Sequence, residues 1–204
     1  MAEEGTTMQR RTRRPMAPRA VGAALLGCLL VLSCGGSSQT TIAGPVATFT
    51  PDEPSPADGS VTLQPGEVSG KLSQVKVSVR GVPDFFGAAF WISYDTTAVA
   101  YHTFDGASSF LRDGGTDIAV QVDAITTPGK IKVGISRIQN AGGTVKGVDV
   151  TDARDLIVLS FIGTKVVVAS PIAFVDGHGE VVSSSLPPGN GIAVTWAGGT
   201  LTVR

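Results

Sequence analysis

One stretch of the sequence, residues 85–95 (FFGAAFWISYD), restricts the possible folds more than any other. In an extended chain its side chains divide between two faces, with Phe86, Ala88, Phe90, Ile92 and Tyr94 on one and Gly87, Ala89, Trp91, Ser93 and Asp95 on the other. A period of two is typical of a strand that has one face on a hydrophobic core and the other toward solvent. The stretch therefore predicts a half-buried β-strand that ends in a turn.

Further strand signals follow at short intervals. Residues 118–122 and 131–135 alternate on either side of a Pro-Gly turn and predict a hairpin, and Val75, Val77 and Val79 predict the inner face of a strand at 72–80. The other strand signals lie at 61–63, 99–104, 156–162, 172–175, 181–183 and 192–203. With 26 Gly, 12 Pro and no long stretch of helical period, about nine such segments predict an all-β, two-sheet β-sandwich. A barrel is the structural alternative.

Two connections are expected to matter for packing. The loop at 106–115 carries Phe110 and Leu111, which are predicted to pack on the core. The connection at 142–155 is polar and leaves room for one helical turn.

The N-terminal residues are typical of an export signal. Five arginines between residues 10 and 19 precede 14 apolar or small residues at 20–33, too few for the roughly 20 that span a bilayer. Val31-Leu32-Ser33-Cys34 resembles the bacterial lipobox, in which a signal peptidase cuts before a diacylated cysteine. We therefore expect a signal peptide at 1–33 and a lipid on Cys34; the alternative is ordinary secretory cleavage near this cysteine.

Two details refine this expectation. A second lipobox-like site at Cys28 would leave the apolar residues 29–32 exposed, so Cys34 is preferred. Gly35 follows Cys34, and by resemblance to proteobacterial lipoproteins, in which Asp at this place causes inner-membrane retention, it favours the outer membrane. A flexible tether is then predicted at 34–60, because this segment is rich in Pro, Gly and small polar residues, with room for one short strand at 46–49. The folded domain is predicted at 61–204.

Charge and cysteine content limit the class of protein. Without the five arginines and two glutamates of the first 34 residues, 11 basic residues remain against 15 acidic ones. A mildly acidic chain lacks the basic patch that nucleic-acid binding needs, so no nucleic-acid partner is predicted. Both cysteines, Cys28 and Cys34, lie in the export region, so the stability of the domain must come from an apolar core without disulfides.

Several segments together resemble the cohesin domain: residues 87–95 with Val99, residues 109–111 with 114–117, residues 131–137 and residues 156–161. The resemblance runs from about residue 61 to the C-terminus and implies a nine-stranded jelly-roll sandwich, close in fold to some carbohydrate-binding modules. Cohesins in cellulosomes hold the dockerin modules of enzymes that degrade plant polysaccharides. Similar domains occur in bacterial lipoproteins, so the resemblance implies a non-catalytic module whose partner is a polysaccharide or a dockerin-like or other carbohydrate-active protein.

The outward side chains of residues 87–93 are the candidate binding surface. Cohesins that bind dockerins carry polar residues on this strand, whereas here Gly87, Ala89, Trp91 and Ser93 point outward, which argues against a standard dockerin contact. An exposed Trp91 could stack on a sugar or anchor a protein, unless a loop or the tether covers it. Cohesin-like pairing would place five further residues on its face: Ala89, Ser93, Gln121, Lys132 and Ser136. The alternative is an ordinary solvated sheet face.

No catalytic site or cofactor is predicted. His102 and His178 are the only histidines and have no metal-ligand spacing, and the serines at 183–185 lack a nucleophile-elbow context. Residues 149–154 are similar to the end of a calcium loop, but the positions that should supply earlier oxygen ligands are Ala141, Gly143 and Val145, so calcium is unsupported. Four aspartates in predicted loops could converge in space and form a carboxylate site: Asp84, Asp95, Asp105 and Asp113. The alternative is that they only form turns, as aspartates in loops usually do.

These observations predict a non-catalytic binding module, lipid-anchored at Cys34 to the bacterial cell envelope, that recognises a polysaccharide or a carbohydrate-active protein. The alternative is a structural or assembly subunit of a surface complex that binds no glycan. A hydrolase with an Asp-based site is a third hypothesis, which has no supporting constellation of residues.

Overall fold

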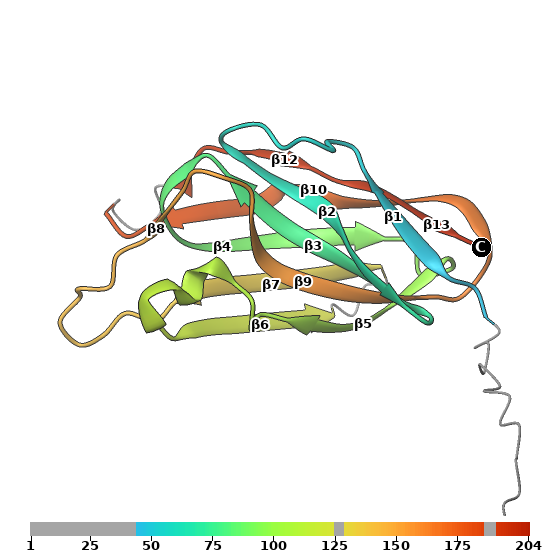
Figure 1. Ribbon diagram of the computed structural model, residues 1–204, viewed down its shortest axis with the longest axis horizontal. Helices are drawn as coiled ribbons and strands as arrows, with labels where there is room; N and C mark the ends of the chain where they lie inside the picture. Colours follow the sequence, from blue (N-terminus) through green and yellow to red (C-terminus); the bar gives the residue numbers. More distant parts are fainter. Residues whose placement is uncertain (1–43, 125–128, 186–190) are drawn as a thin grey trace, which may run out of the picture. The chain divides into compact units, whose positions relative to one another are not determined.

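Two sheets pack face to face and form a β-sandwich, which confirms the predicted fold class (Figure 1). The computed structural model describes residues 44–124, 129–185 and 191–204. The larger sheet, here called the β4 sheet, has the strand order β1-β13-β10-β4-β7-β6, and the smaller, the β3 sheet, has the order β12-β2-β3-β9-β5. The pairing of β12 with β2 is parallel, and the other pairings between described strands are antiparallel.

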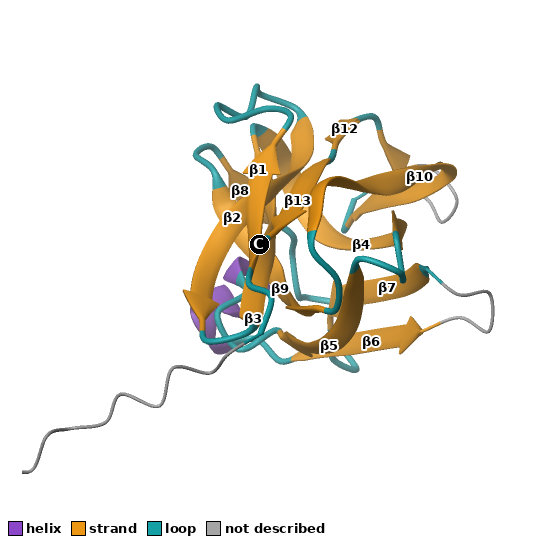
Figure 2. Cartoon of the chain, turned by 90° about the vertical axis from the view of Figure 1, so that its right-hand side faces the viewer, coloured by secondary structure: helices purple, strands orange, loops and turns teal. Residues whose placement is uncertain are grey.

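Figure 2 shows the two layers from the side. In spatial order, the β4 sheet contains β1 (Ala47–Pro51), β13 (Gly199–Val203), β10 (Val167–Ser183), β4 (Val82–Tyr94), β7 (Lys130–Arg137) and β6 (Ile118–Ala124), with β11 (Gly191–Ile192) beside β10 and β8 (Val148–Val150) beside β4. The β3 sheet contains β12 (Thr195–Ala197), β2 (Ser60–Ser69), β3 (Leu72–Arg80), β9 (Arg154–Gly163) and β5 (Val99–Asp105).

The described residues contain thirteen strand segments where the sequence predicted about nine, because β8, β11 and β12 are only two or three residues long. The connection at 142–155 carries β8 in place of the helical turn that the sequence left open. The one helical segment in the described ranges is the short 3-10 helix η1 (Phe110–Gly115). No helix there is long and apolar enough to cross a membrane.

The sandwich begins before residue 61, so the predicted boundary between tether and domain is too late. Strand β1 pairs with β13 from Ala47 opposite Val203 to Pro51 opposite Gly199. Ala47 and Phe49 face the core and are buried. The apolar alternation here is only two residues long and runs into a Pro-rich segment, so the pattern in the sequence is too short to distinguish a strand from a tether.

The core forms where the inner faces of the two sheets meet. Val75, Val77 and Val79 of β3 are buried as predicted, and the predicted hairpin is the antiparallel pair β6–β7, with Val122 opposite Val133. On β4, Ala88, Phe90 and Ile92 are buried. Because these strands alternate, the residues between them point outward, and this alternation positions the candidate site.

The predicted alternation of β4 fails at its first residues. Phe85 is fully buried and packs edge-on against Phe110, with 5.3 Å between ring centroids, whereas Phe86 lies outside the buried core. The reason is a register shift against β10, in which Val182 pairs with Gly87 but Ser183 pairs with Phe85. One extra residue on one strand is a β-bulge, and it turns the face of every residue beyond it.

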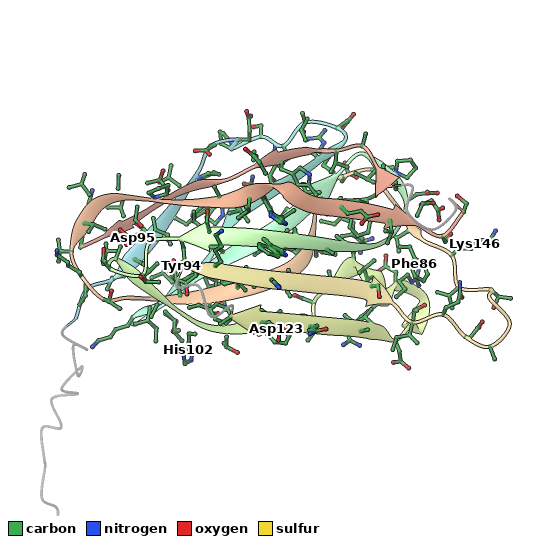
Figure 3. The ribbon with its side chains drawn as sticks, turned by 180° about the vertical axis from the view of Figure 1, so that it is seen from behind. Phe86, Tyr94, Asp95, His102, Asp123 and Lys146 are labelled. Carbon is green, nitrogen blue, oxygen red and sulfur yellow. The ribbon has the colours of Figure 1, made fainter. Side chains whose placement is uncertain are left out.

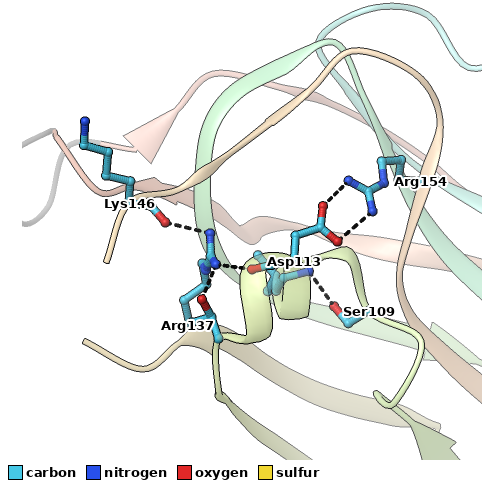
Figure 4. Close-up of polar contacts among 7 residues, drawn as sticks. Ser109, Asp113, Arg137, Lys146 and Arg154 are labelled. Carbon is cyan, nitrogen blue, oxygen red and sulfur yellow. Dashed lines mark hydrogen bonds and ion pairs between the residues drawn. The ribbon is translucent and has the colours of Figure 1, made fainter. Parts of the chain in front are cut away.

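A polar cluster joins η1 to both sheets (Figure 4). Asp113 accepts two hydrogen bonds from the Arg154 guanidinium, at 2.6 and 3.0 Å. The backbone carbonyl of Asp113 also accepts a hydrogen bond from Arg137, which donates to the carbonyl of Lys146 as well. These contacts hold Phe110 and Leu111 in the core, where both are buried as the sequence predicted.

Candidate functional site

The candidate site is the solvent-facing side of strands β10, β4, β7 and β6, which we call the outer face. Figure 3 looks onto it, with Tyr94 and Asp95 at one end of β4, Phe86 at the other and Asp123 on β6. Across this face Ala89 of β4 lies opposite Gly134 of β7, and Gly134 lies opposite Gln121 of β6. On the same strands Phe90, Ile131 and Val133 are buried, so their neighbours point to solvent.

The structure brings together all six residues that the sequence proposed for a binding face. Trp91 pairs with Lys132, and Gly87, which precedes Ala89 by two residues, pairs with Ser136. None of the six belongs to the buried core. They lie on the three neighbouring strands β4, β7 and β6: Ala89, Trp91, Ser93, Gln121, Lys132 and Ser136.

Trp91 points to this face but is only half exposed. The imidazole of His178 stacks on the indole ring, with 3.9 Å between centroids and an interplanar angle of 7°. The Lys132 ammonium lies over the same ring, 4.6 Å from its centroid. The indole is therefore covered in part by a residue of β10, whereas the sequence left a loop or the tether as the alternatives to an exposed ring.

His178 was missed as a member of this site, and its position follows from a break in β10. The pairing of β10 with β4 shifts between Phe174 and Gly179, and Gly177 has the positive φ of 71° that favours glycine. A side chain at Gly179 would collide with the Trp196 ring, since an added Cβ would lie 2.7 Å from its Cε2 atom. Gly177 and Gly179 flank His178, and glycines inside a strand indicate a bulge. This pattern is the sequence signal that could have predicted His178 as a member of the site.

A shallow groove lies beside Trp91, and we call it the Gly134 groove. A side chain added at Gly134 would meet no atom within 4 Å, so the space above this residue is open. One hollow of about 470 Å³ and a second of about 240 Å³ both border on Ala89, Gln121 and Gly134, so they are continuous. Small side chains on the floor and an aromatic residue at one end form a site that a protruding side chain of a partner can enter.

A second polar cluster, outside the outer face, surrounds the carboxylate of Asp84. Ser184 and Ser185 donate hydroxyl hydrogen bonds to it at 2.5 and 2.6 Å, Ser183 also donates to it, and the Gly147 amide donates at 3.0 Å. Burial alone would raise the pKa of Asp84, but these hydrogen bonds outweigh burial and hold the pKa well below its usual value of 3.8. The cluster ties the start of β4 to the end of β10.

Asp84→Asn is expected to lower the free energy of unfolding at pH 7 by about 1–2 kcal/mol, because the half-buried hydrogen bonds to a charge are weakened. The folded state has the lower pKa, so the ionised carboxylate stabilises the fold above about pH 4 and this contribution is lost as pH falls through the folded pKa. The difference between wild type and variant should therefore shrink between about pH 5 and pH 2 in urea unfolding. Asp152→Asn, at an exposed turn, is the control.

If the Asp84→Asn difference stays constant over this pH range, the carboxylate charge does not stabilise the cluster. A loss of stability equal to that of Asp152→Asn would likewise contradict the role of the serine hydrogen bonds.

The other three candidate aspartates each have a hydrogen-bond partner of their own. Asp95 accepts hydrogen bonds from Thr97, Asp105 accepts one from the Ala107 amide, and Asp113 binds Arg154. Each therefore has a local structural role. Within residues 44–124, 129–185 and 191–204, no three His, Cys, Asp or Glu side chains lie close enough to hold a metal ion together.

Comparison with known proteins gives matches only at the level of structure. No protein-family model and no curated protein matches the sequence. Two solved structures illustrate the similarity. A type II cohesin domain from the cellulosome of Acetivibrio cellulolyticus matches 76% of this chain and 94% of its own, with a TM-score of 0.50 and 12% identity. A structure of a type I cohesin–dockerin complex from Clostridium thermocellum matches over 69% of this chain and 96% of its own, with a TM-score of 0.51 and 15% identity.

At this level of identity the similarity concerns the fold. The chain has a cohesin-like jelly-roll sandwich, as the resemblance in the sequence implied. The fold by itself assigns no ligand to the outer face, because one fold supports many functions.

Proposed function

We propose that this protein is a non-catalytic, protein-binding module, exported and lipid-anchored at Cys34, and that the outer face holds its partner. The single observation that carries the proposal is the Gly134 groove, an open hollow bordered by Trp91 in the middle of a four-stranded face. A central aromatic residue beside a pocket is the usual arrangement of an interface hot spot. The dockerin complex from Clostridium thermocellum supports protein recognition by analogy of fold.

The environment of Trp91 favours a protein over a polysaccharide. Sugar rings bind tryptophan by lying flat on the indole, and here His178 already stacks on the ring while Lys132 lies over it. A glycan would have to displace one of these residues. A protein partner can pack against the edge of the indole and place a side chain in the Gly134 groove without moving either one.

The local roles of the aspartates support the non-catalytic part of the proposal. Asp84, Asp95 and Asp113 each accept hydrogen bonds from neighbouring side chains, so a structural role accounts for these carboxylates without a catalytic one. The proposed context is the bacterial cell surface, with the partner being a dockerin-like or other module of a carbohydrate-active protein.

Trp91→Ala tests the proposal in a pulldown of exported proteins combined with a glycan array. We expect wild-type protein to retain a protein partner, and the variant to bind it roughly 10- to 100-fold more weakly, as for a hot-spot aromatic. Phe104→Ala is the matched control, since Phe104 is an exposed aromatic residue on β5 of the β3 sheet. The control should bind like the wild type.

Other outcomes have distinct meanings. Binding to a glycan that is lost in Trp91→Ala would replace the protein partner by a polysaccharide. Equal binding by wild type and Trp91→Ala would remove Trp91 from the site. Absence of binding to either class, with concentration-dependent self-association, would favour the structural subunit in place of a binding module.

A further inference from the structure

The chain enters the described domain at one end of the sandwich, which we call the entry end. Here Val46 and Arg204 exchange two backbone hydrogen bonds, of 2.7 and 3.0 Å, and Ala47 pairs with Val203, so the start of β1 lies beside the end of β13 (Figure 1). Gly44 lies against the Lys71 side chain in the β2–β3 turn, and Gly163 at the end of β9 lies against Pro45. Gly44, the first described residue, therefore lies at this end of the sandwich.

Exposed aliphatic side chains gather at the entry end. Val166 is 65% exposed and Val168 is 88% exposed, and Val167 between them pairs with Val203 in β13. Val68, which is 49% exposed, lies two residues before the β2–β3 turn at the same end. Of the five large hydrophobic residues that are exposed in the described ranges, these three lie at the entry end, so exposed apolar surface is concentrated at this end of the sandwich.

The length of chain between Cys34 and Gly44 limits how far the exposed valines of the entry end can lie from a lipid on Cys34. Ten peptide steps separate Cys34 from Gly44, and even a fully extended chain of that length spans at most about 35 Å. If Cys34 is acylated, the bilayer surface lies within that distance of the entry end. The effective concentration of such a tethered surface is on the order of millimolar or more, so a weak aliphatic contact is sufficient for docking.

Charge contributes little to this contact. Lys71, Lys165 and Arg204 carry positive charge at the entry end, but Glu67 and Asp95 lie there too. Hydrogen bonds from Thr97, and to a smaller extent the charge of Lys165, hold the pKa of Asp95 below its usual value, so this carboxylate stays ionised near Lys165. Because these charges nearly balance, the exposed valines supply most of the attraction between the entry end and a bilayer.

We propose that the entry end docks on the bilayer that holds the acyl chains of Cys34, with Val166 and Val168 entering the boundary between headgroups and acyl chains. The inference rests on the lipid anchor of the proposed function. In this orientation the strands of the β4 sheet run away from the membrane, since Asp95 lies at the opposite end of the outer face from Phe86 and Lys146 (Figure 3). The Gly134 groove is then held clear of the lipid and open to a partner.

The test uses the mature lipidated protein in vesicles of phosphatidylethanolamine and phosphatidylglycerol. Cys28 is removed with the signal peptide and the thiol of Cys34 is alkylated, so a Val168→Cys variant carries one free thiol for an environment-sensitive fluorophore. Ile138→Cys is the matched control, because Ile138 is 48% exposed and lies at the end of β7 far from the entry end. Quenching by nitroxide-labelled lipid is measured for both labelled proteins.

We expect the fluorophore at position 168 to be quenched several-fold more strongly than the one at position 138. Adding Val166→Asp to the labelled Val168→Cys protein should remove most of that quenching, without a change in thermal unfolding because the residue is exposed. Equal quenching at both positions, or none at 168, overturns the docking. Mass spectrometry of the acylated cysteine separates the two proposals: an acylated protein without quenching contradicts only the docking, and a protein without acyl chains contradicts the anchor and the docking together.

Discussion

Replacing Phe90 with alanine is expected to lower the free energy of unfolding by about 3–5 kcal/mol, enough to leave the domain marginally folded. Phe90 is 1% exposed and packs against Phe174 and Trp196, with 5.5 and 5.9 Å between ring centroids. Truncation would leave a cavity between rings that cannot collapse, because Trp196 is also confined by the Gly179 backbone. Urea unfolding followed by far-ultraviolet circular dichroism measures the change.

Two companion variants make this prediction specific. Phe90→Leu keeps most of the volume and should cost less than half as much, and Phe104→Ala, which removes a ring that is 37% exposed, should cost about 1 kcal/mol. If Phe90→Ala destabilises the protein no more than Phe104→Ala does, Phe90 does not pack between the two sheets.

Replacing Gly134 with arginine is expected to weaken partner binding by roughly 100-fold or more, while the free energy of unfolding changes by no more than about 0.5 kcal/mol. The added side chain would fill the Gly134 groove from its floor. It would not disturb the fold, because a Cβ at this position meets no atom within 4 Å and β7 accepts any residue with an extended backbone.

The measurement is the dissociation constant for the protein captured by the wild type, with thermal unfolding recorded in parallel. Ala100→Arg, at an exposed position on β5 of the β3 sheet, adds the same side chain away from the outer face and should leave binding unchanged. Full affinity in Gly134→Arg would show that the partner binds elsewhere. A fall in both binding and stability would show that the groove is part of the packed structure and not an open site.

The local alternation of apolar and polar residues was sufficient to predict most of the fold. Alternating residues placed Val75, Val77 and Val79 in the core and predicted the β6–β7 hairpin, because a strand with one buried face must repeat with period two. The same rule put Trp91 on the outer face, and the strand pairing of the cohesin resemblance put Gln121 and Lys132 beside it. For residues 46–49 the sequence indicated no more than a short strand within the tether, because two core residues are too few to assign it to the sandwich.

The parts that escaped prediction depend on contacts between distant residues. Phe85 and not Phe86 is buried because a bulge shifts the register of β4 against β10, and His178 reaches Trp91 because β10 breaks at its glycines. Asp84 meets serines about 100 residues further along the chain. Pairing register and bulge position are set by the neighbouring strand, so the residues of one strand alone do not determine them.

The sequence by itself thus determined the all-β sandwich and the face on which Trp91 lies, since both follow from which side chains alternate along a single strand. Only the tertiary structure decided what surrounds Trp91: an imidazole stacked on its ring, an ammonium over it and an open groove above Gly134. Those neighbours come from two strands, β10 and β7, on either side of β4, and their meeting depends on how the sheet pairs, which no local pattern encodes.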